Sequence, residues 1–140
     1  MTVRPFFVGG EPVIGSGPAF VSQNPATGEQ NAEFSSASAR DVDAAVAVAQ
    51  KASREPSWRA MRPHERARVL SRIADGMTAR SEGLALAQMR ENGKVISECR
   101  SQVAGAIATY RYFAAVCETT GSEVTPARGD YLSMMVYEPV

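Results

Sequence analysis

The chain has 140 residues, of which 44% are hydrophobic and 21% are charged, and its formal net charge is zero. These proportions are typical of a soluble globular protein that is long enough to bury a core. A neutral balance gives no general attraction to nucleic acid or to an anionic membrane, and no apolar run approaches the roughly 18 residues that a membrane span needs. The first apolar run is too short for a secretory signal, so we expect a cytoplasmic protein with no nucleic-acid or membrane partner.

The first 35 residues are predicted to be extended. Gly9 and Gly10 stand between two apolar pairs in "PFFVGGEPVIG", a pattern typical of a hairpin. Two further short strands, "AFVSQ" and "AEFSSAS", flank the corner "NPATG". Pro25 fixes its own φ, and Gly28 supplies a position where φ can be positive. We therefore expect this corner to be a tight turn that joins two strands.

Four helices are predicted after the strands. Ser38 with Asp41 three residues later is close to a capping box, and apolar residues follow at helical spacing. The stretch "SREPSWRAMRP" is predicted to break this first helix, and Pro63 to open the second. Ser81 and Ser97 are the expected N-caps of the third and fourth helices.

A single strand is predicted at the end of the chain, in "YLSMMVYEPV". Its apolar residues are nearly continuous, which suits a strand that is covered on both sides. Such a strand must pair with something, either in this chain or in another. The predicted order is therefore N-terminal hairpin strands, four helices and one C-terminal strand.

Seven short motifs occur along the chain in a recognisable order. They are "NPATGE", "DVDAAVAVAQKA", a Trp in a Pro-flanked break, "ERARVLSRIAD", "ENGK", "YRYFA" and "YEPV". Each motif alone is weak, but in this order the chain resembles the N-terminal segment of the NAD(P)-dependent aldehyde dehydrogenase superfamily, from about Phe6 to Val140.

This resemblance implies an α/β parent fold with a Rossmann-type cofactor domain. Residues 1–130 would form the N-terminal part of that domain, in which this mostly helical segment precedes the dinucleotide-binding motifs. Residues 131–140 would begin an oligomerisation strand. The complete enzyme would use NAD or NADP to oxidise a small aldehyde to a carboxylic acid, and the residues that choose between the two cofactors would lie further along.

No catalytic or cofactor-binding residue is expected within the chain itself. The family's chemistry needs a cysteine nucleophile in a G-Q-x-C setting, a glutamate base in E-[LM]-G-G-K and an asparagine for the oxyanion. Cys99 in "SECRS" and Cys117 in "AAVCETT" do not match the first motif. We therefore expect the 140-residue chain alone to have no dehydrogenase activity.

The resemblance places the start of the fourth helix along a substrate tunnel. The positions that would face or approach it are Arg100, Ser101, Ala104, Gly105 and Ala108. Gly105 stands where many relatives have a larger side chain, and a glycine inside a helix costs roughly 1 kcal/mol relative to alanine. Two interpretations stay open: close packing of this helix on another element, or a wider tunnel.

The resemblance also implies a monovalent cation site. Glu91 would supply a carboxylate, and Ser22 and Gln23 would supply backbone carbonyl oxygens, a donor set that suits a hard cation. Many relatives have Asp at the position of Glu91. The alternative is that Glu91 is a solvated surface charge at a helix end.

The terminal strand is the expected contact with other subunits. Its candidate residues are Tyr131, Leu132, Met134 and Val136. The implied partners are the remainder of the enzyme and further copies of it, in a dimer or a tetramer. The competing hypothesis is a stand-alone, non-catalytic helical module that binds partners through this strand.

Overall fold

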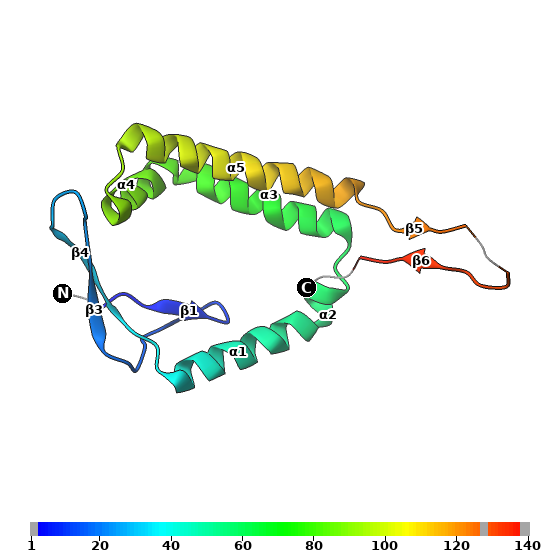
Figure 1. The fold of residues 1–140 in the computed structure, drawn as a ribbon, viewed down its shortest axis with the longest axis horizontal. Helices are drawn as coiled ribbons and strands as arrows, with labels where there is room; N and C mark the ends of the chain where they lie inside the picture. The colour runs from blue at the N-terminus through cyan, green and yellow to red at the C-terminus, as the bar shows by residue number, and fades with distance from the viewer. Residues whose placement is uncertain (1–2, 127–128, 138–140) are drawn as a thin grey trace.

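The computed structural model describes residues 3–126 and 129–137, and Figure 1 shows their arrangement. Four short strands come first, and five helices and two further strands follow. The strands are β1 (Phe6–Val8), β2 (Glu11–Val13), β3 (Ala19–Gln23), β4 (Gln30–Ser35), β5 (Glu123–Val124) and β6 (Met134–Met135). The helices are α1 (Ala39–Arg54), α2 (Pro56–Arg59), α3 (Pro63–Ala79), α4 (Ser81–Asn92) and α5 (Ile96–Thr119).

Two antiparallel hairpins form the N-terminal part, as predicted. β1 pairs with β2 across a two-residue turn in which Gly9 and Gly10 have φ of 63° and 89°. Both values lie in the region that only glycine adopts readily, which is why a Gly-Gly pair marks this hairpin. β3 pairs with β4, and the rings of Phe20 and Phe34 stack across this pair with centroids 5.5 Å apart.

The corner between β3 and β4 is the tight turn that its residues predicted. The Gly28 N–H donates to the Asn24 carbonyl at 2.7 Å, and the Ala26 N–H donates to Asn24 Oδ1 at 3.0 Å. Gly28 has φ of 75°, a value that closes the turn without side-chain strain. Asn24 therefore holds the corner through its own backbone and side chain.

The first helix begins at the predicted capping box. The Asp41 N–H donates to Ser38 Oγ, and the Ser38 N–H donates to Asp41 Oδ2. After α1, the break predicted in "SREPSWRAMRP" is partly wrong, because Pro56–Arg59 forms the one-turn helix α2. Pro56 is suited to a first helical turn, and Arg66 steadies this turn from α3. Its guanidinium lies 5.2 Å from the Trp58 ring centroid, and Nη2 donates to the Trp58 carbonyl.

Two predicted N-caps are displaced by one or two residues. Arg80 and Val95 occupy the N-cap positions of α4 and α5, and Ser81 is the first residue of α4. Val95 already has an extended backbone, with φ of −69° and ψ of 142°, so α5 begins before Ser97. Neither cap makes a side-chain hydrogen bond, and propensity and packing therefore set these two helix starts.

The core lies among α3, α4 and α5. In Figure 1, α5 runs alongside α3 in the opposite direction, and α4 joins them at one end. The buried apolar side chains are small: Ala67 and Ala74 on α3, Ala85 on α4, and Cys99, Val103 and Ala114 on α5. Small residues let these helices approach closely. Among the described residues, no helix is long and apolar enough to cross a membrane.

The C-terminal part differs from the single predicted strand. β6 covers only Met134–Met135, and it pairs antiparallel with β5, which the sequence patterns did not predict. Pro126, and Gly129 with φ of 70°, lie between the two strands and allow the chain to reverse. Figure 1 shows this pair projecting from the helices as an arm. The last three residues of the predicted strand, 138–140, lie outside the described residues.

Candidate functional site

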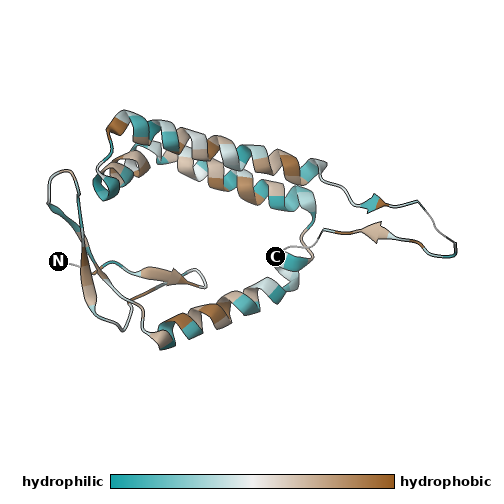
Figure 2. Ribbon diagram, viewed as in Figure 1, coloured by the Kyte–Doolittle hydropathy of each residue, from teal (hydrophilic) through white to brown (hydrophobic). Residues whose placement is uncertain are grey.

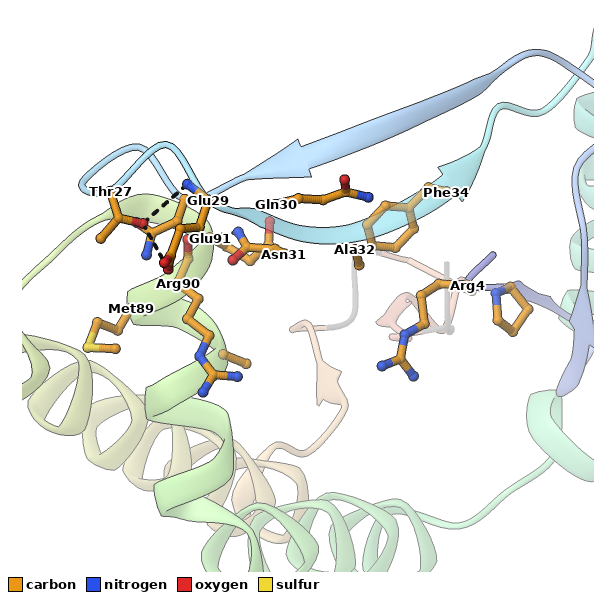
Figure 3. Close-up of a pocket in the computed structure, with 13 residues that line it drawn as sticks. Arg4, Thr27, Glu29, Gln30, Asn31, Ala32, Phe34, Met89, Arg90 and Glu91 are labelled. Atoms are coloured by element: carbon orange, nitrogen blue, oxygen red, sulfur yellow. Dashed lines mark hydrogen bonds between the residues drawn. The ribbon is translucent and has the colours of Figure 1, made fainter. Parts of the chain in front are cut away.

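A pocket of about 770 Å³ lies between the β3–β4 hairpin and the end of α4. Figure 3 shows the side chains of Thr27, Glu29 and Asn31 on the hairpin near Arg90 and Glu91 of α4. These residues are far apart in the sequence. Gly93, the left-handed C-cap of α4, lies close to the corner, and a methyl group on it would be 3.0 Å from Pro25 Cγ. The corner "NPATG" therefore rests against the point where α4 ends.

Hydrogen bonds join the hairpin to the last turn of α4. The Ser22 hydroxyl donates to Glu91 Oε2 at 2.6 Å, and Asn31 Nδ2 donates to the Arg90 carbonyl at 2.9 Å. The same amide lies 3.4 Å from Ser22 Oγ. Asn31 was not predicted as a site residue, because a single polar residue on a half-exposed strand carries no signal of its own.

The residues of the predicted cation site are thus close together. Ser22 contacts Glu91 directly, and Gln23 follows Ser22 at an irregularity in the β3–β4 pairing. The described residues include no group of three His, Cys, Asp or Glu side chains arranged to hold a metal. A site made of one carboxylate and backbone carbonyls does not need such a group, and its oxygen donors fit a hard cation. Binding of a monovalent cation here stays a prediction.

The five predicted tunnel residues lie on α5 between its first turn and its middle, and all are exposed. Arg100 reaches the start of α4, where its Nε and Nη2 donate to the two carboxylate oxygens of Glu82 at 2.9 and 2.6 Å. Apart from its chain neighbours and the backbone of its own helix, a methyl group at Gly105 would meet no described atom within 4 Å. The described part of the chain therefore has no element that packs closely against Gly105, and the tunnel stays a prediction.

The Glu82–Arg100 ion pair should make the free energy of unfolding depend on pH. The hydrogen bonds that Arg100 donates to Glu82 lower the pKa of Glu82, and the same bonds raise the pKa of Arg100. A carboxylate with a lowered folded-state pKa stabilises the fold above its unfolded pKa and loses that contribution as pH falls through the folded value. Glu82→Gln should therefore lower the free energy of unfolding at neutral pH and leave it unchanged in acid, as measured by urea unfolding. Because both side chains are exposed, added salt should shrink the difference. A difference that persists in acid would contradict this origin.

The two cysteines lie in different environments on α5. Cys99 is fully buried in a cluster with Ala85 and Val103, against which Met89, Ile96 and Ile107 pack. Cys117 is half-buried near the end of α5, and both thiols are free. Cys99 therefore packs as a small residue of the core.

Comparison with known proteins identifies the family. The sequence profile of the aldehyde dehydrogenase family matches residues 14–140. The chain belongs to the aldehyde dehydrogenase family. It is 41% identical over 134 residues to N-succinylglutamate 5-semialdehyde dehydrogenase of Paraburkholderia xenovorans, covering 95% of this chain and 27% of that protein. It is 34% identical over 138 residues to aminoacetaldehyde dehydrogenase of Pseudomonas aeruginosa, covering 98% of this chain and 28% of that protein.

Solved structures support the same fold. The NAD⁺ complex of aldehyde dehydrogenase from Bacillus cereus matches with a TM-score of 0.88 at 30% identity, covering 95% of this chain and 28% of that one. The NAD-dependent aldehyde dehydrogenase of Sinorhizobium meliloti matches with a TM-score of 0.85 at 30% identity, covering 92% and 26%. The resemblance seen in the motifs is confirmed, as is the expectation of a mostly helical segment of the aldehyde dehydrogenase fold. The chain spans about a quarter of the length of these aldehyde dehydrogenases.

Proposed function

We propose that this chain is the N-terminal segment of an NAD(P)-dependent aldehyde dehydrogenase that oxidises a small aldehyde to a carboxylic acid. The observation that carries this proposal is the family match over residues 14–140, together with a TM-score of 0.88 to an aldehyde dehydrogenase of which the chain covers 28%. Two solved relatives are described with NAD, which supports NAD as the cofactor of the longer enzyme. No residue of this chain is assigned to cofactor contact.

The exposed apolar side chains on α1 support a contact between this chain and the rest of the enzyme. Figure 2 shows apolar residues along α1, where Val42 and Val46 are 50% and 61% exposed. Apolar surface of this kind favours association, because covering it removes it from water. We propose that the remainder of the enzyme covers this face, and that the chain supplies helices to the cofactor-binding domain.

The arm supports a second contact, with other copies of the enzyme. Tyr131 and Leu132 are 81% and 71% exposed, and Met134 and Val136 are also exposed. A two-residue strand pair carrying so many apolar side chains has little support of its own. We propose that this arm joins subunits of a homo-oligomer, a dimer or a tetramer.

The test is a comparison of the 140-residue chain with the product of any longer reading frame that contains it. NADH formation with simple aldehydes should occur with the longer protein and be absent with the 140-residue chain, because aldehyde oxidation needs a thiolate nucleophile and a general base. Thiol-dependent turnover by the 140-residue chain would overturn its predicted inactivity. No turnover by a folded longer protein with any aldehyde tested would overturn the dehydrogenase proposal.

Gly105 provides a test of the tunnel in the longer enzyme. Gly105→Met should raise KM for bulky aldehydes by about tenfold and leave small aldehydes nearly unaffected, because the added side chain fills space that only large substrates need. Gly76→Met is the matched control, since Gly76 is also a helical glycine with open space around its Cβ position. Equal losses for all aldehydes in the Gly105 variant would favour the packing interpretation.

The competing function is a stand-alone interaction module without catalysis. The exposed arm favours it, because an unpaired apolar edge can add to a partner's sheet. Light scattering together with the aldehyde assay distinguishes the dehydrogenase from the interaction module. A monomeric longer protein that oxidises no aldehyde would favour the module. An active oligomer would exclude it.

A further inference from the structure

A basic pocket of about 590 Å³ lies where the arm of β5 and β6 returns to the helices. Figure 1 shows β6 on the part of the arm that runs back toward α2. Arg59 and Arg62, at the corner between α2 and α3, line the pocket together with Arg66 of α3. Tyr137, the last described residue after β6, lines it as well. No Asp or Glu side chain is among the described residues that line this pocket.

Arg66 is the arginine that is most firmly held in this pocket. It is half-buried, whereas Arg68 and Arg72 of the same helix are exposed. Its Nη2 donates to the carbonyls of Trp58 and Arg59, at 2.9 and 3.3 Å. Its Nε is buried and has no hydrogen-bond partner among the described residues. Buried N–H groups are nearly always hydrogen-bonded, because an unpaired one has lost its hydration for nothing. An acceptor from outside the described residues is therefore expected at this nitrogen.

A carboxylate is the acceptor that fits this nitrogen best. The N–H donors of a guanidinium lie in one plane and bind a carboxylate strongly, and Nε carries one of these donors. The neighbouring Glu65 is already engaged, because its Oε2 accepts from the Arg62 N–H at 2.9 Å where α3 begins. Asp130 lies in the turn between β5 and β6. The next acidic residue along the chain is Glu138, which directly follows the pocket residue Tyr137.

We propose that Glu138 supplies the carboxylate that binds Arg66 Nε, and that this ion pair closes the base of the arm. Glu138 itself lies outside the described residues. Successive Cα atoms are about 3.8 Å apart, so a glutamate next to Tyr137 begins within side-chain reach of the pocket. The first strand of the arm continues from α5, and the ion pair holds the chain after the second strand to α3.

An arm held at both ends has a fixed direction, which a pair of two-residue strands cannot set by itself. This inference rests on the proposed function in one respect, because the arm held in this way is the one proposed to join subunits. The ion pair would then position that contact without taking part in it.

Thermal unfolding of the longer protein that contains this chain tests the ion pair. Glu138→Gln should lower the melting temperature by about 2–4 °C, because it leaves the half-buried Arg66 without its partner. In an Arg66→Met background the same substitution should have no effect, because the pair is already broken. Glu123→Gln is the matched control, since it removes the same charge from an exposed position on the arm. This control should have the same effect in both backgrounds. Equal effects of Glu138→Gln in the two backgrounds, or no effect in either, would overturn the proposal.

A crystal structure of the longer protein tests the pair without any substitution, and it serves where Arg66→Met does not fold. A carboxylate oxygen of Glu138 should lie within about 3.2 Å of Arg66 Nε. Water, a backbone carbonyl or a different acidic side chain at this nitrogen would overturn the proposal. Neither measurement uses aldehyde turnover. A longer protein that is inactive but shows the ion pair would therefore contradict the proposed dehydrogenase and not this inference.

Discussion

Gly15→Ala should lower the free energy of unfolding of the chain by about 3 kcal/mol, the upper end of what an overpacked site usually costs. A Cβ atom at this position would lie 2.2 Å from the carbonyl oxygen of Ser36 and 2.8 Å from its carbonyl carbon. Both are backbone atoms, so no side-chain rotation relieves the overlap. The loop must lift from the hairpin, and it then loses the Gly15 N–H bond to Ser35 Oγ.

Urea unfolding followed by circular dichroism measures this loss. Gly76→Ala is the control, because Gly76 lies inside α3 and a methyl group there would meet no described atom within 4 Å beyond its chain neighbours and its own helix backbone. The control should raise the free energy of unfolding by about 1 kcal/mol, since alanine is the better helix former. Glycine-to-alanine substitution should thus lower the free energy of unfolding at Gly15 and raise it at Gly76. Equal stability of Gly15→Ala and the unmodified chain would show that this loop does not rest on Ser36.

Local backbone signals predicted much of this fold. The Gly9–Gly10 turn, the "NPATG" corner with its positive φ at Gly28, and the Ser38–Asp41 capping box are all present. Each depends on the conformational limits of one or two residues and their near neighbours. Such limits act regardless of the rest of the molecule, and a sequence pattern is enough to predict them.

Features that depend on residues far away in the sequence were not predicted from the sequence patterns. α2 is one turn supported by Arg66 from the next helix, and β5 exists only because β6 lies opposite it. The contact between Ser16 and Asp41 joins residues that no periodicity relates. Turn and helix patterns carry no information about which surfaces meet, so these features needed the structure.

The candidate site also depends on residues that are distant in the sequence. Ser22 and Glu91 are 69 residues apart, and the family resemblance, not a local pattern, predicted that they meet. The Ser22 hydroxyl donates to Glu91 in the structure, and the cation site itself stays a prediction. The residues on α5 that were predicted to line a tunnel have no facing wall among the described residues, since the chain spans about a quarter of the length of its relatives.

Ala85→Asp should prevent the helical core from forming a stable fold, with a loss of about 3–5 kcal/mol in the free energy of unfolding, as expected for an unpaired buried charge. Ala85 is fully buried between Cys99 and Val103, where Met89, Ile96 and Ile107 also pack. Every neighbour in this cluster is apolar or a thiol, so the introduced carboxylate has no strong hydrogen-bond donor among those side chains. Burial without a partner penalises the charged form.

The matched control lies two residues along the same helix. Ala87 is exposed, and Ala87→Asp should lower the free energy of unfolding by less than about 1 kcal/mol, mainly through helix propensity. The gap between the two variants should narrow as pH falls from neutral toward about 4, the unfolded-state pKa of Asp, because burial raises the folded-state pKa and the buried carboxyl is then protonated. Urea unfolding at neutral and acidic pH measures both effects. If the two variants are equally stable at neutral pH, the cluster around Cys99 is open to water and is not the core of this chain.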